Sequence, residues 1–206
     1  PLSLLQLIVK TATSTAMKVV NDVFISYFLI NLYRNLPMSG NISYTLNFFN
    51  KNMKIIELSE RPDLLKAAVQ YFWTCWGNET NFIFYEDCIL HSLKPEKSLP
   101  KFYVLLEDDK IIGSYALLTN DIISRQDLMP WFACLFVNED KRNEGLGELL
   151  LAHGLKEANL KGFPMLYLST DLEGFYEKKG WIFFGDGYGV SGGYNKIYAK
   201  QTTRQF

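Results

Sequence analysis

The sequence has few cysteines and few histidines, and its charges nearly balance. Its 206 residues include 3 cysteines and 2 histidines, and its formal net charge is −1. Cys75, Cys88 and Cys134 form an odd, widely spaced set in apolar surroundings, which favours reduced thiols over a disulfide framework. The two histidines, His91 and His153, cannot build a metal site with such scattered cysteines, so we predict no metal. The lack of a basic excess argues against general nucleic-acid binding.

Hydrophobic runs long enough to span a membrane are also missing. A bilayer span needs about 20 consecutive apolar residues, whereas polar and charged residues interrupt the apolar patches of residues 19–36. The N-terminal stretch also lacks the basic start, compact apolar run and small-residue cleavage site of a signal peptide. We therefore expect a cytoplasmic protein with no membrane partner. An apolar content of 48% is ample for a packed core.

One stretch, residues 131–161, organises the rest of the chain as a strand, a turn and a helix. Residues 131–137 are all apolar, with the aromatic and β-branched content of a strand covered on both faces. Apolar residues at helical spacing follow the turn and predict a helix that ends near Gly162. The turn itself consists of Arg142, Asn143, Glu144, Gly145, Leu146 and Gly147.

This turn has the chemistry of an anion-binding site. Gly145 and Gly147 flank Leu146 and let a ligand approach the backbone closely. The amide groups that open the following helix have no partner within it, and the helix dipole places partial positive charge there. A pyrophosphate is well suited to such a place, and Arg142 adds a charged fork of donors.

The turn resembles the acyl-CoA-binding signature of the GNAT superfamily of N-acetyltransferases, which is Arg/Gln-x-x-Gly-x-Gly/Ala after an apolar strand. A second segment, residues 174–181, resembles the family's Phe-Tyr-Glu-Lys-x-Gly-Phe segment at the usual distance. The resemblance covers about residues 53–200. It implies an α/β (α+β) fold, with a twisted, mixed and mostly antiparallel sheet of six to seven strands. A splayed parallel strand pair and about four flanking helices belong to that fold.

The resemblance also implies a binding mode for acetyl-CoA. The backbone of Leu135, Phe136 and Val137 would pair with the pantetheine arm like an added strand, and one N–H group would stabilise the oxyanion. Residues 142–147 would hold the pyrophosphate, with Asn143 in place of a common family glycine; Asn tolerates left-handed backbone well. The family's Asn before Phe-Tyr is missing, and Ser169 or Thr170 is a candidate substitute.

The reaction needs a general acid and a general base, and the resemblance identifies a candidate residue only for the acid. Tyr176 matches the family tyrosine proposed to protonate the leaving thiolate, although packing against the cofactor is an alternative role. The general base has no family match, because residues 131–137 carry no carboxylate. We take Asp127 as the candidate base; deprotonation relayed by water stays open, as do the candidates Glu86, Asp87 and Asp171.

The predicted function is transfer of the acetyl group of acetyl-CoA to a primary amine, directly within a ternary complex. The acceptor is a small molecule or an exposed protein amine, and the carboxylates at positions 86, 87, 121 and 127 lean toward a cationic one. A longer acyl group is a rival donor. The alternative from another class is a non-catalytic acyl-CoA sensor or interaction module. A homodimer is compatible with either function.

The remaining elements follow from local patterns. Residues 53–206 are expected to form the GNAT domain. Residues 1–52 are either an extension outside this fold, for instance from an upstream translation start, or a helical appendage packed on the domain or a dimer partner. We expect helices at 62–76, 85–93 and 172–179. Strands are expected at 53–58, 101–107, 110–119, 163–169, 181–184 and 194–200, with a glycine-rich hairpin loop at 185–193.

Overall fold

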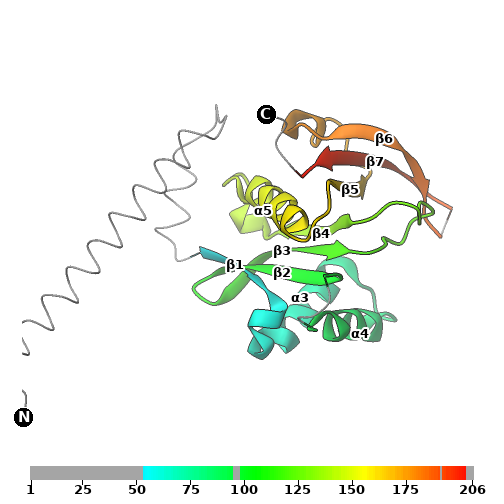
Figure 1. Cartoon of the computed structure of the whole chain (residues 1–206). Helices are drawn as coiled ribbons and strands as arrows, with labels where there is room; N and C mark the ends of the chain where they lie inside the picture. Colours follow the sequence, from blue (N-terminus) through cyan, green and yellow to red (C-terminus); the bar gives the residue numbers. More distant parts are fainter. Residues whose placement is uncertain (1–52, 95–97, 191, 203–206) are drawn as a thin grey trace, which may run out of the picture. The chain divides into compact units, whose positions relative to one another are not determined.

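A seven-stranded sheet forms the centre of the described part of the chain. The structure is a computed structural model, and it describes residues 53–94, 98–190 and 192–202. The strands lie in the order β1-β2-β3-β4-β5-β7-β6, and within this sheet only β4 and β5 pair in parallel (Figure 1). The predicted mixed, mostly antiparallel sheet is therefore confirmed. The strands are β1 Met53–Glu57, β2 Lys101–Glu107, β3 Lys110–Leu118, β4 Trp131–Val137, β5 Met165–Thr170, β6 Ile182–Tyr188 and β7 Tyr194–Gln201.

Helices cover both faces of this sheet. In the described residues there are three α-helices: α3 (Leu65–Trp76), α4 (Phe82–Ser92) and α5 (Leu146–Leu160). Helices α3 and α4 lie on one face, and α5 lies on the other (Figure 1). The start of the first predicted helix, at Pro62, is a short 3-10 turn that leads directly into α3.

The prediction of a helix over residues 172–179 is wrong. This segment holds only a 3-10 turn, η4 (Glu177–Lys179). Gly174 and Gly180 both have a φ of +73°, a left-handed conformation that a right-handed helix cannot continue through. The segment between them is too short to nucleate a helix, because forming one turn fixes several dihedral angles and gains only a single hydrogen bond.

The sixth strand is longer than its sequence predicts. β6 continues through Gly185, Asp186 and Gly187 to Tyr188, so the first four residues of the predicted glycine-rich loop are strand. A register shift between Phe183 and Gly185 accommodates the glycines within the pairing with β7. The backbone ladder with β7 thus overrides the poor intrinsic strand preference of glycine.

Two hydrophobic cores lie on opposite faces of the sheet. The α5 core packs Leu146, Leu150 and Leu151 of the helix against Tyr115 and Phe132 of β3 and β4. The α3–α4 core packs the buried face of the two other helices against alternate residues of β1, β2 and β3. The central strands are therefore apolar on both faces, which explains their continuous apolar sequences.

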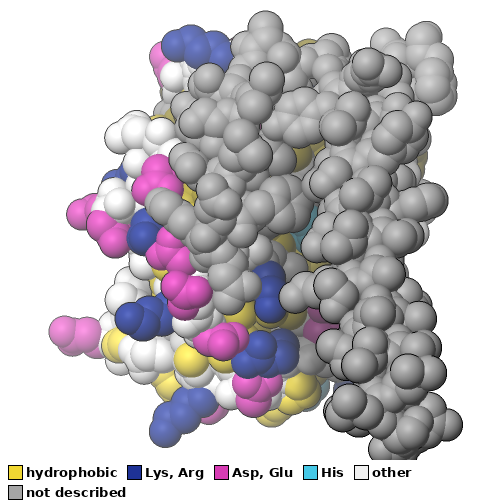
Figure 2. Space-filling model, turned by 90° about the vertical axis from the view of Figure 1, so that its left-hand side faces the viewer, with side chains coloured by type: hydrophobic (Ala, Val, Ile, Leu, Met, Phe, Trp, Pro, Cys, Tyr) yellow, Lys and Arg dark blue, Asp and Glu magenta, His cyan; other side chains and the backbone are white. Residues whose placement is uncertain are grey.

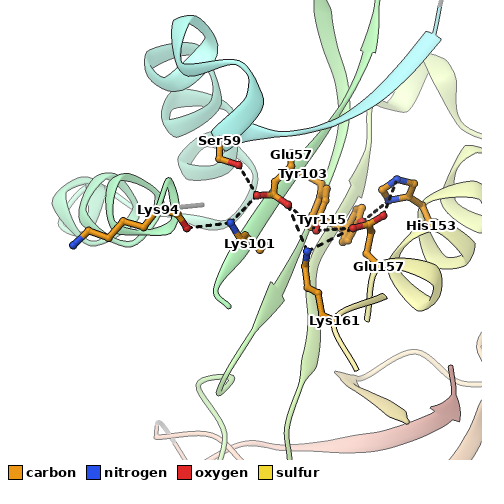
Figure 3. Close-up of polar contacts among 9 residues, drawn as sticks. All are labelled: Glu57, Ser59, Lys94, Lys101, Tyr103, Tyr115, His153, Glu157 and Lys161. Atoms are coloured by element: carbon orange, nitrogen blue, oxygen red, sulfur yellow. Dashed lines mark hydrogen bonds and ion pairs between the residues drawn. The ribbon is translucent and has the colours of Figure 1, made fainter. Parts of the chain in front are cut away.

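A polar network lies at the edge of the α5 core and connects the helix to β1, β2 and β3 (Figure 3). Lys101, whose side chain is only 3% exposed, forms an ion pair with Glu57 at 2.7 Å. The hydroxyl of Tyr103 lies 3.3 Å from a carboxylate oxygen of Glu57 and 3.4 Å from one of Glu157. We call this set the anchor network; its members are Glu57, Lys101, Tyr103, Tyr115, His153, Glu157 and Lys161.

The described surface carries charges of both signs. Figure 2 shows acidic and basic side chains interspersed on the described part of one face. Arg61 and Asp63, for example, form an ion pair at 2.7 Å. No helix in the described ranges combines the length and apolarity needed to cross a membrane. The predictions for residues 1–52 lie outside the described residues.

Candidate functional site

β4 and β5 separate almost as soon as they have paired. Their only paired positions are Trp131 and Tyr167, and the N–H of Tyr167 donates to the carbonyl of Pro130 at 3.1 Å. Toward the C-terminal end of β4 the described strands share no further ladder positions. We call the space between them the β4–β5 opening. It leaves one edge of a central strand without a strand partner, which is the arrangement that accepts an extended ligand.

The pairing of β4 with β3 determines which residues of β4 face this opening. The N–H of Asn138 donates to the carbonyl of Ile112 at 2.9 Å, and the next ladder positions pair Val137 with Gly113 and Phe136 with Ser114. Backbone groups of successive residues alternate in direction along a strand. The N–H and C=O of Phe136 therefore point toward β3, whereas those of Leu135 and Val137 point toward the β4–β5 opening.

A bulge in β4 produces this alternation. The ladder with β3 shifts by one residue between Ala133 and Phe136, and Cys134 has a φ of +55°. The Oγ of Ser114 donates to the carbonyl of Cys134 at 3.1 Å and so satisfies a group that the bulge removes from the ladder. No sequence signal predicts this bulge, since cysteine has no preference for left-handed backbone.

Residues 142–147, which we call the cofactor loop, leave the N-terminus of α5 uncapped by any side chain. Asn143 and Gly145 have φ angles of +66° and +76°, so Asn143 takes the left-handed conformation that its type tolerates. A Cβ atom built on Gly147 would meet nothing within 4 Å. The first turn of α5 therefore offers backbone N–H groups beside open space, as an anion site requires.

Arg142 links this loop to β4. Its Nε donates to the carbonyl of Val137 at 3.2 Å, and its guanidinium carbon lies 5.5 Å from the ring centroid of Phe136. One Nη atom lies 3.4 Å from Glu139, and the side chain stays 49% exposed. The guanidinium is thus positioned beside the loop by β4 and remains accessible to an anion.

The other predicted loop residues have structural surroundings of their own. Leu146 is buried in the α5 core, and Glu144 is half-buried. Glu148, in the first turn of α5, forms an ion pair with Lys179 at 2.9 Å. This pair connects the start of α5 to the segment that follows Tyr176, so the two sequence motifs are brought together.

Tyr176 is 7% exposed and packs within the α5 core. Its ring centroid lies 6.2 Å from that of Trp181 and 6.0 Å from that of Tyr198. Its hydroxyl forms no hydrogen bond with the described residues. Every fully buried side-chain oxygen of the described residues has a hydrogen-bond partner. The hydroxyl of Tyr176 is therefore not fully buried and is accessible to solvent. Burial, with a smaller contribution from the charge of Asp171, raises the pKa of Tyr176 to about 12. The phenol is therefore protonated throughout the neutral range.

Ser169 and Thr170 end β5 and use their hydroxyl groups locally. Ser169 Oγ accepts a hydrogen bond from the side-chain amide of Asn195 at 3.2 Å. Thr170 Oγ1 accepts one from the N–H of Leu172 at 3.0 Å and so stabilises the turn after β5. Both residues remain partly exposed.

The structure does not favour the predicted base, Asp127. Arg125 binds both of its carboxylate oxygens, at 2.8 and 2.6 Å, and this pairing holds the pKa of Asp127 below its ordinary value. The other three candidates are exposed: Glu86 and Asp87 lie on α4, where Asp87 pairs with His91 at 3.2 Å, and Asp171 follows β5. None of the four combines burial with a free carboxylate, which a base needs for a raised pKa.

The cysteines are unpaired thiols, and one of them, Cys134, lies in the bulge of β4. All three cysteines are free and half-buried. Burial raises the pKa of the Cys134 thiol to about 12. In the described ranges, no three His, Cys, Asp or Glu side chains are grouped so as to hold a metal ion.

Part of the chain matches a known domain family, and the structure is similar to solved structures of acetyltransferases. Residues 98–182 match the family model of the GNAT acetyltransferase domain. The structure is similar to that of aminoglycoside 6'-acetyltransferase type Ii, with a TM-score of 0.58 and 20% identity over 74% of this chain and 99% of that one. An aminoglycoside 6'-N-acetyltransferase complexed with coenzyme A gives a TM-score of 0.57 and 16% identity, over 74% of this chain and 99% of that one.

A third similar structure is a GNAT family acetyltransferase from Elizabethkingia anophelis with acetyl-CoA bound. Its TM-score is 0.50, with 17% identity over 73% of this chain and 98% of that one. Among curated proteins, none matches the sequence significantly. Residues 98–182 thus match the GNAT acetyltransferase domain family, and the described sheet and helices around them have the GNAT fold.

Proposed function

We propose that this protein transfers the acetyl group of acetyl-CoA to a primary amine. The observation that carries the proposal is the β4–β5 opening, which ends at the uncapped N-terminus of α5. A strand edge beside a site for a pyrophosphate matches the two parts of coenzyme A, an extended pantetheine arm and a diphosphate. Two of the similar structures, by their titles, contain coenzyme A or acetyl-CoA.

In this proposal, acetyl-CoA lies along β4. The backbone groups of Leu135 and Val137 pair with the pantetheine arm, since these groups face the opening and those of Phe136 face β3. The cofactor loop and Arg142 bind the pyrophosphate. An N–H group of β4 that faces the opening stabilises the negative charge that develops on the thioester oxygen. The hydroxyls of Ser169 and Thr170 lie on the opposite strand and are available as side-chain contacts.

The chemistry requires two proton movements. A neutral amine nitrogen attacks the thioester carbonyl carbon, the C–N bond forms, and the C–S bond breaks with its electron pair going to sulfur. An ammonium acceptor starts with three protons and the amide product keeps one, so one proton reaches the sulfur and one reaches solvent. Tyr176 gives its proton to the departing thiolate and regains one from the second amine proton through solvent.

Direct transfer within a ternary complex is favoured over an acetyl-cysteine intermediate. Cys134 is the cysteine nearest in sequence to Leu135, but its thiol has a pKa of about 12 because of burial and the nearby negative charge of Asp121. The thiolate, not the thiol, is the nucleophile. At neutral pH the Cys134 thiol is therefore protonated, which favours direct transfer of the acetyl group to the amine.

Two kinds of acceptor fit this proposal: a small-molecule amine and an exposed protein amine. Two of the similar structures are, by title, aminoglycoside acetyltransferases, which favours a small cationic amine. Free thiols and the use of acetyl-CoA favour a cytoplasmic protein. The second candidate function is that of a sensor, in which the described domain binds acetyl-CoA without turnover. The pairing of Arg125 with both carboxylate oxygens of Asp127 favours this function.

One experiment separates the two functions. The full chain is incubated with acetyl-CoA and a panel of amines that includes aminoglycosides, polyamines and lysine peptides, and free thiol is followed with time. Thiol release that depends on the amine, with acetylated product in the mass spectrum, is the expected result. Tight binding of acetyl-CoA by calorimetry without turnover of any amine would favour the sensor.

A further inference from the structure

A carboxylate outside the predicted catalytic residues lies on the loop at the base of the β4–β5 opening. Residues 119–130, which we call the acceptor loop, join β3 to β4, where Leu118 pairs with Trp131. Trp131 is also the residue at which β4 and β5 pair. Ile123 and Leu128 of the acceptor loop pack against Trp131, so the loop is held beneath this junction.

The acceptor loop is held firmly in place. The N–H of Ser124 donates to the carbonyl of Tyr188 at 2.8 Å, and Ser124 Oγ accepts from the N–H of Tyr188 at 3.0 Å, which fixes the loop to the end of β6. The side-chain amide of Gln126 donates to the carbonyls of Asp121 and Ile123 at 3.2 and 2.6 Å. The backbone of Asp121 is therefore positioned from both sides.

Within the described ranges, the carboxylate of Asp121 has no cationic partner. One of its oxygens accepts a hydrogen bond from the N–H of Ile122 at 2.8 Å, and no described Lys, Arg or His forms an ion pair with it. The contrast with Asp127 on the same loop is direct, because Arg125 occupies both oxygens of that residue. A half-buried carboxylate without a cation is open to a cationic ligand.

Asp121 also lies within electrostatic reach of the reacting strand. Its charge contributes to the raised pKa of Cys134, the bulge residue directly before Leu135. Leu135 is one of the two residues whose backbone faces the opening. Burial raises the pKa of Asp121 itself above its ordinary value, and the hydrogen bond from Ile122 only partly opposes this shift. A carboxylate with a raised pKa is a stronger base than an exposed one.

We propose that Asp121 is the general base that takes a proton from the acceptor ammonium before the nitrogen attacks the thioester. This inference rests on the proposed acetyltransferase function and names a residue for a step that the family resemblance leaves open. The ammonium donates to the Asp121 carboxylate, one N–H bond breaks and one O–H bond forms, and the neutral nitrogen is left. Asp121 then releases the proton to solvent. The same carboxylate selects a primary amine that is protonated in water.

The test uses the full-length protein and the best amine of the panel. Asp121→Asn should lower kcat/KM for the amine about a hundredfold at pH 7, within the range for loss of a general base. The loss should shrink as the pH approaches the pKa of the free amine, because the acceptor then arrives already neutral. Binding of acetyl-CoA, measured by calorimetry, should not change, and Asp121→Glu should restore part of the rate.

Stability provides a second readout. The pKa of Asp121 is higher in the folded protein than in the unfolded chain, so the ionised carboxylate destabilises the folded state at pH values above the unfolded-state pKa. The Asp121→Asn variant has no such charge and should therefore have an equal or higher Tm at pH 7. Asp63→Asn is the matched control; Asp63 is exposed, pairs with Arg61 and should keep the wild-type rate. A lower rate in the Asp121 variant then reflects lost chemistry and not lost folding.

The outcomes distinguish this inference from the function beneath it. If the Asp121→Asn variant has the wild-type rate and pH profile, Asp121 is not the general base. The activity of the wild-type protein would still support the acetyltransferase function. A larger loss in Asp127→Asn than in Asp121→Asn also overturns it. A folded wild-type protein that acetylates no amine in the panel overturns both proposals together.

Discussion

At the scale of single residues, small structural details determine which substitutions are informative. Gly145 has a positive φ, so replacing it would strain the backbone and disturb folding as well as binding. Gly147 has neither a positive φ nor a neighbour within 4 Å of an added Cβ. Tyr176 is buried, but its hydroxyl makes no hydrogen bond to the described residues. Gly147 and Tyr176 therefore allow ligand binding and chemistry to be tested without loss of the fold.

Larger side chains at Gly147 should weaken binding of coenzyme A in proportion to their size. Gly147→Ala should have a small effect, and Gly147→Leu should lower the affinity at least tenfold, or about 1.4 kcal/mol. The side chain would occupy space that the diphosphate needs beside the helix amides. Calorimetry with coenzyme A measures the affinity, and thermal unfolding checks the fold. Gly193→Leu, a position that is also open, is the control for size; equal affinities in all variants would contradict the prediction.

Tyr176→Phe should lower kcat about a hundredfold and leave the affinity for acetyl-CoA nearly unchanged. The variant loses the proton donor for the thiolate but keeps the ring that packs against Trp181 and Tyr198. Steady-state rates from pH 6 to 9 and calorimetry provide the two measurements. A variant that keeps the full rate across this pH range would show that Tyr176 only packs within the core.

At the scale of elements, the anchor network connects the C-terminal half of α5 to β1, β2 and β3 (Figure 3). The N-terminus of α5 lies at the other end of the helix, where it begins within the cofactor loop. Ion pairs join Lys161, after the helix, to Glu57 on β1 and Glu157 on α5, both at 3.6 Å. The hydroxyl of Tyr115 on β3 lies 2.5 Å from Nδ1 of His153. The network thus fixes the helix whose opposite end is proposed to bind the diphosphate.

The buried pair of Lys101 and Glu57 should show strong coupling. Lys101→Met leaves the Glu57 carboxylate short of its nearest cation and should reduce the free energy of unfolding by about 3 kcal/mol. Glu57→Gln in the same protein should recover at least about 1 kcal/mol of that loss, because the charge left behind is removed. Urea unfolding of the two single variants and the double variant measures the coupling. Strictly additive losses would mean that the two side chains do not interact.

Acid should weaken the anchor network through His153. Burial lowers the pKa of His153, and Lys156 and Lys161 add to this shift while Glu157 opposes it. The unfolded chain therefore binds more protons than the folded one, so stability is complete above about pH 6.5 and is lost as the pH falls through the folded-state pKa. Besides the charged groups of α5 and Lys161, the ionisable groups that contact His153 are Tyr103, whose ring centroid lies 5.6 Å from that of His153, and Tyr115 (Figure 3).

His153→Gln should therefore flatten the fall in Tm between pH 7 and 5. Glutamine keeps a polar group near Tyr115 but does not titrate. His91→Gln is the control, because His91 is an exposed residue on α4. Thermal unfolding at a series of pH values measures the slope, and an unchanged slope in the His153 variant would exclude its titration as a source of acid sensitivity.

At the scale of the whole molecule, the described residues form the whole seven-stranded sheet and the helices on its two faces. β1 and β6 are its edge strands, and helices cover both faces (Figure 1). We propose that residues 53–206 form the catalytic domain and that residues 1–52 are an extension outside it. The chain that starts at Met53 should then have the same Tm and kcat as the full chain. A loss of either would indicate that residues 1–52 pack on the domain or on a dimer partner.

The features that the sequence predicted correctly are local ones. The strand predicted at 131–137 is β4, and the strands predicted at 101–107 and 110–119 are β2 and β3. The two residues that join β2 to β3, Asp108 and Asp109, both have positive φ angles. The start of α5 at Leu146, directly after the two left-handed residues of the cofactor loop, also follows from neighbouring residues. Such elements depend on apolar spacing and on glycine, asparagine or aspartate at particular positions, and these are visible within a few residues of sequence.

Tertiary contacts decided the rest. Nothing near Cys134 in the sequence signals a bulge, which the ladder with β3 and the hydroxyl of Ser114 stabilise. Asp121 and Asp127 are equivalent in sequence, yet Arg125 pairs with one and burial raises the pKa of the other. The sequence by itself determined the proposed cofactor loop, because that site is built from adjacent backbone groups. The tertiary structure alone distinguished the carboxylates, because burial and charge pairing depend on which distant segments the fold brings into contact.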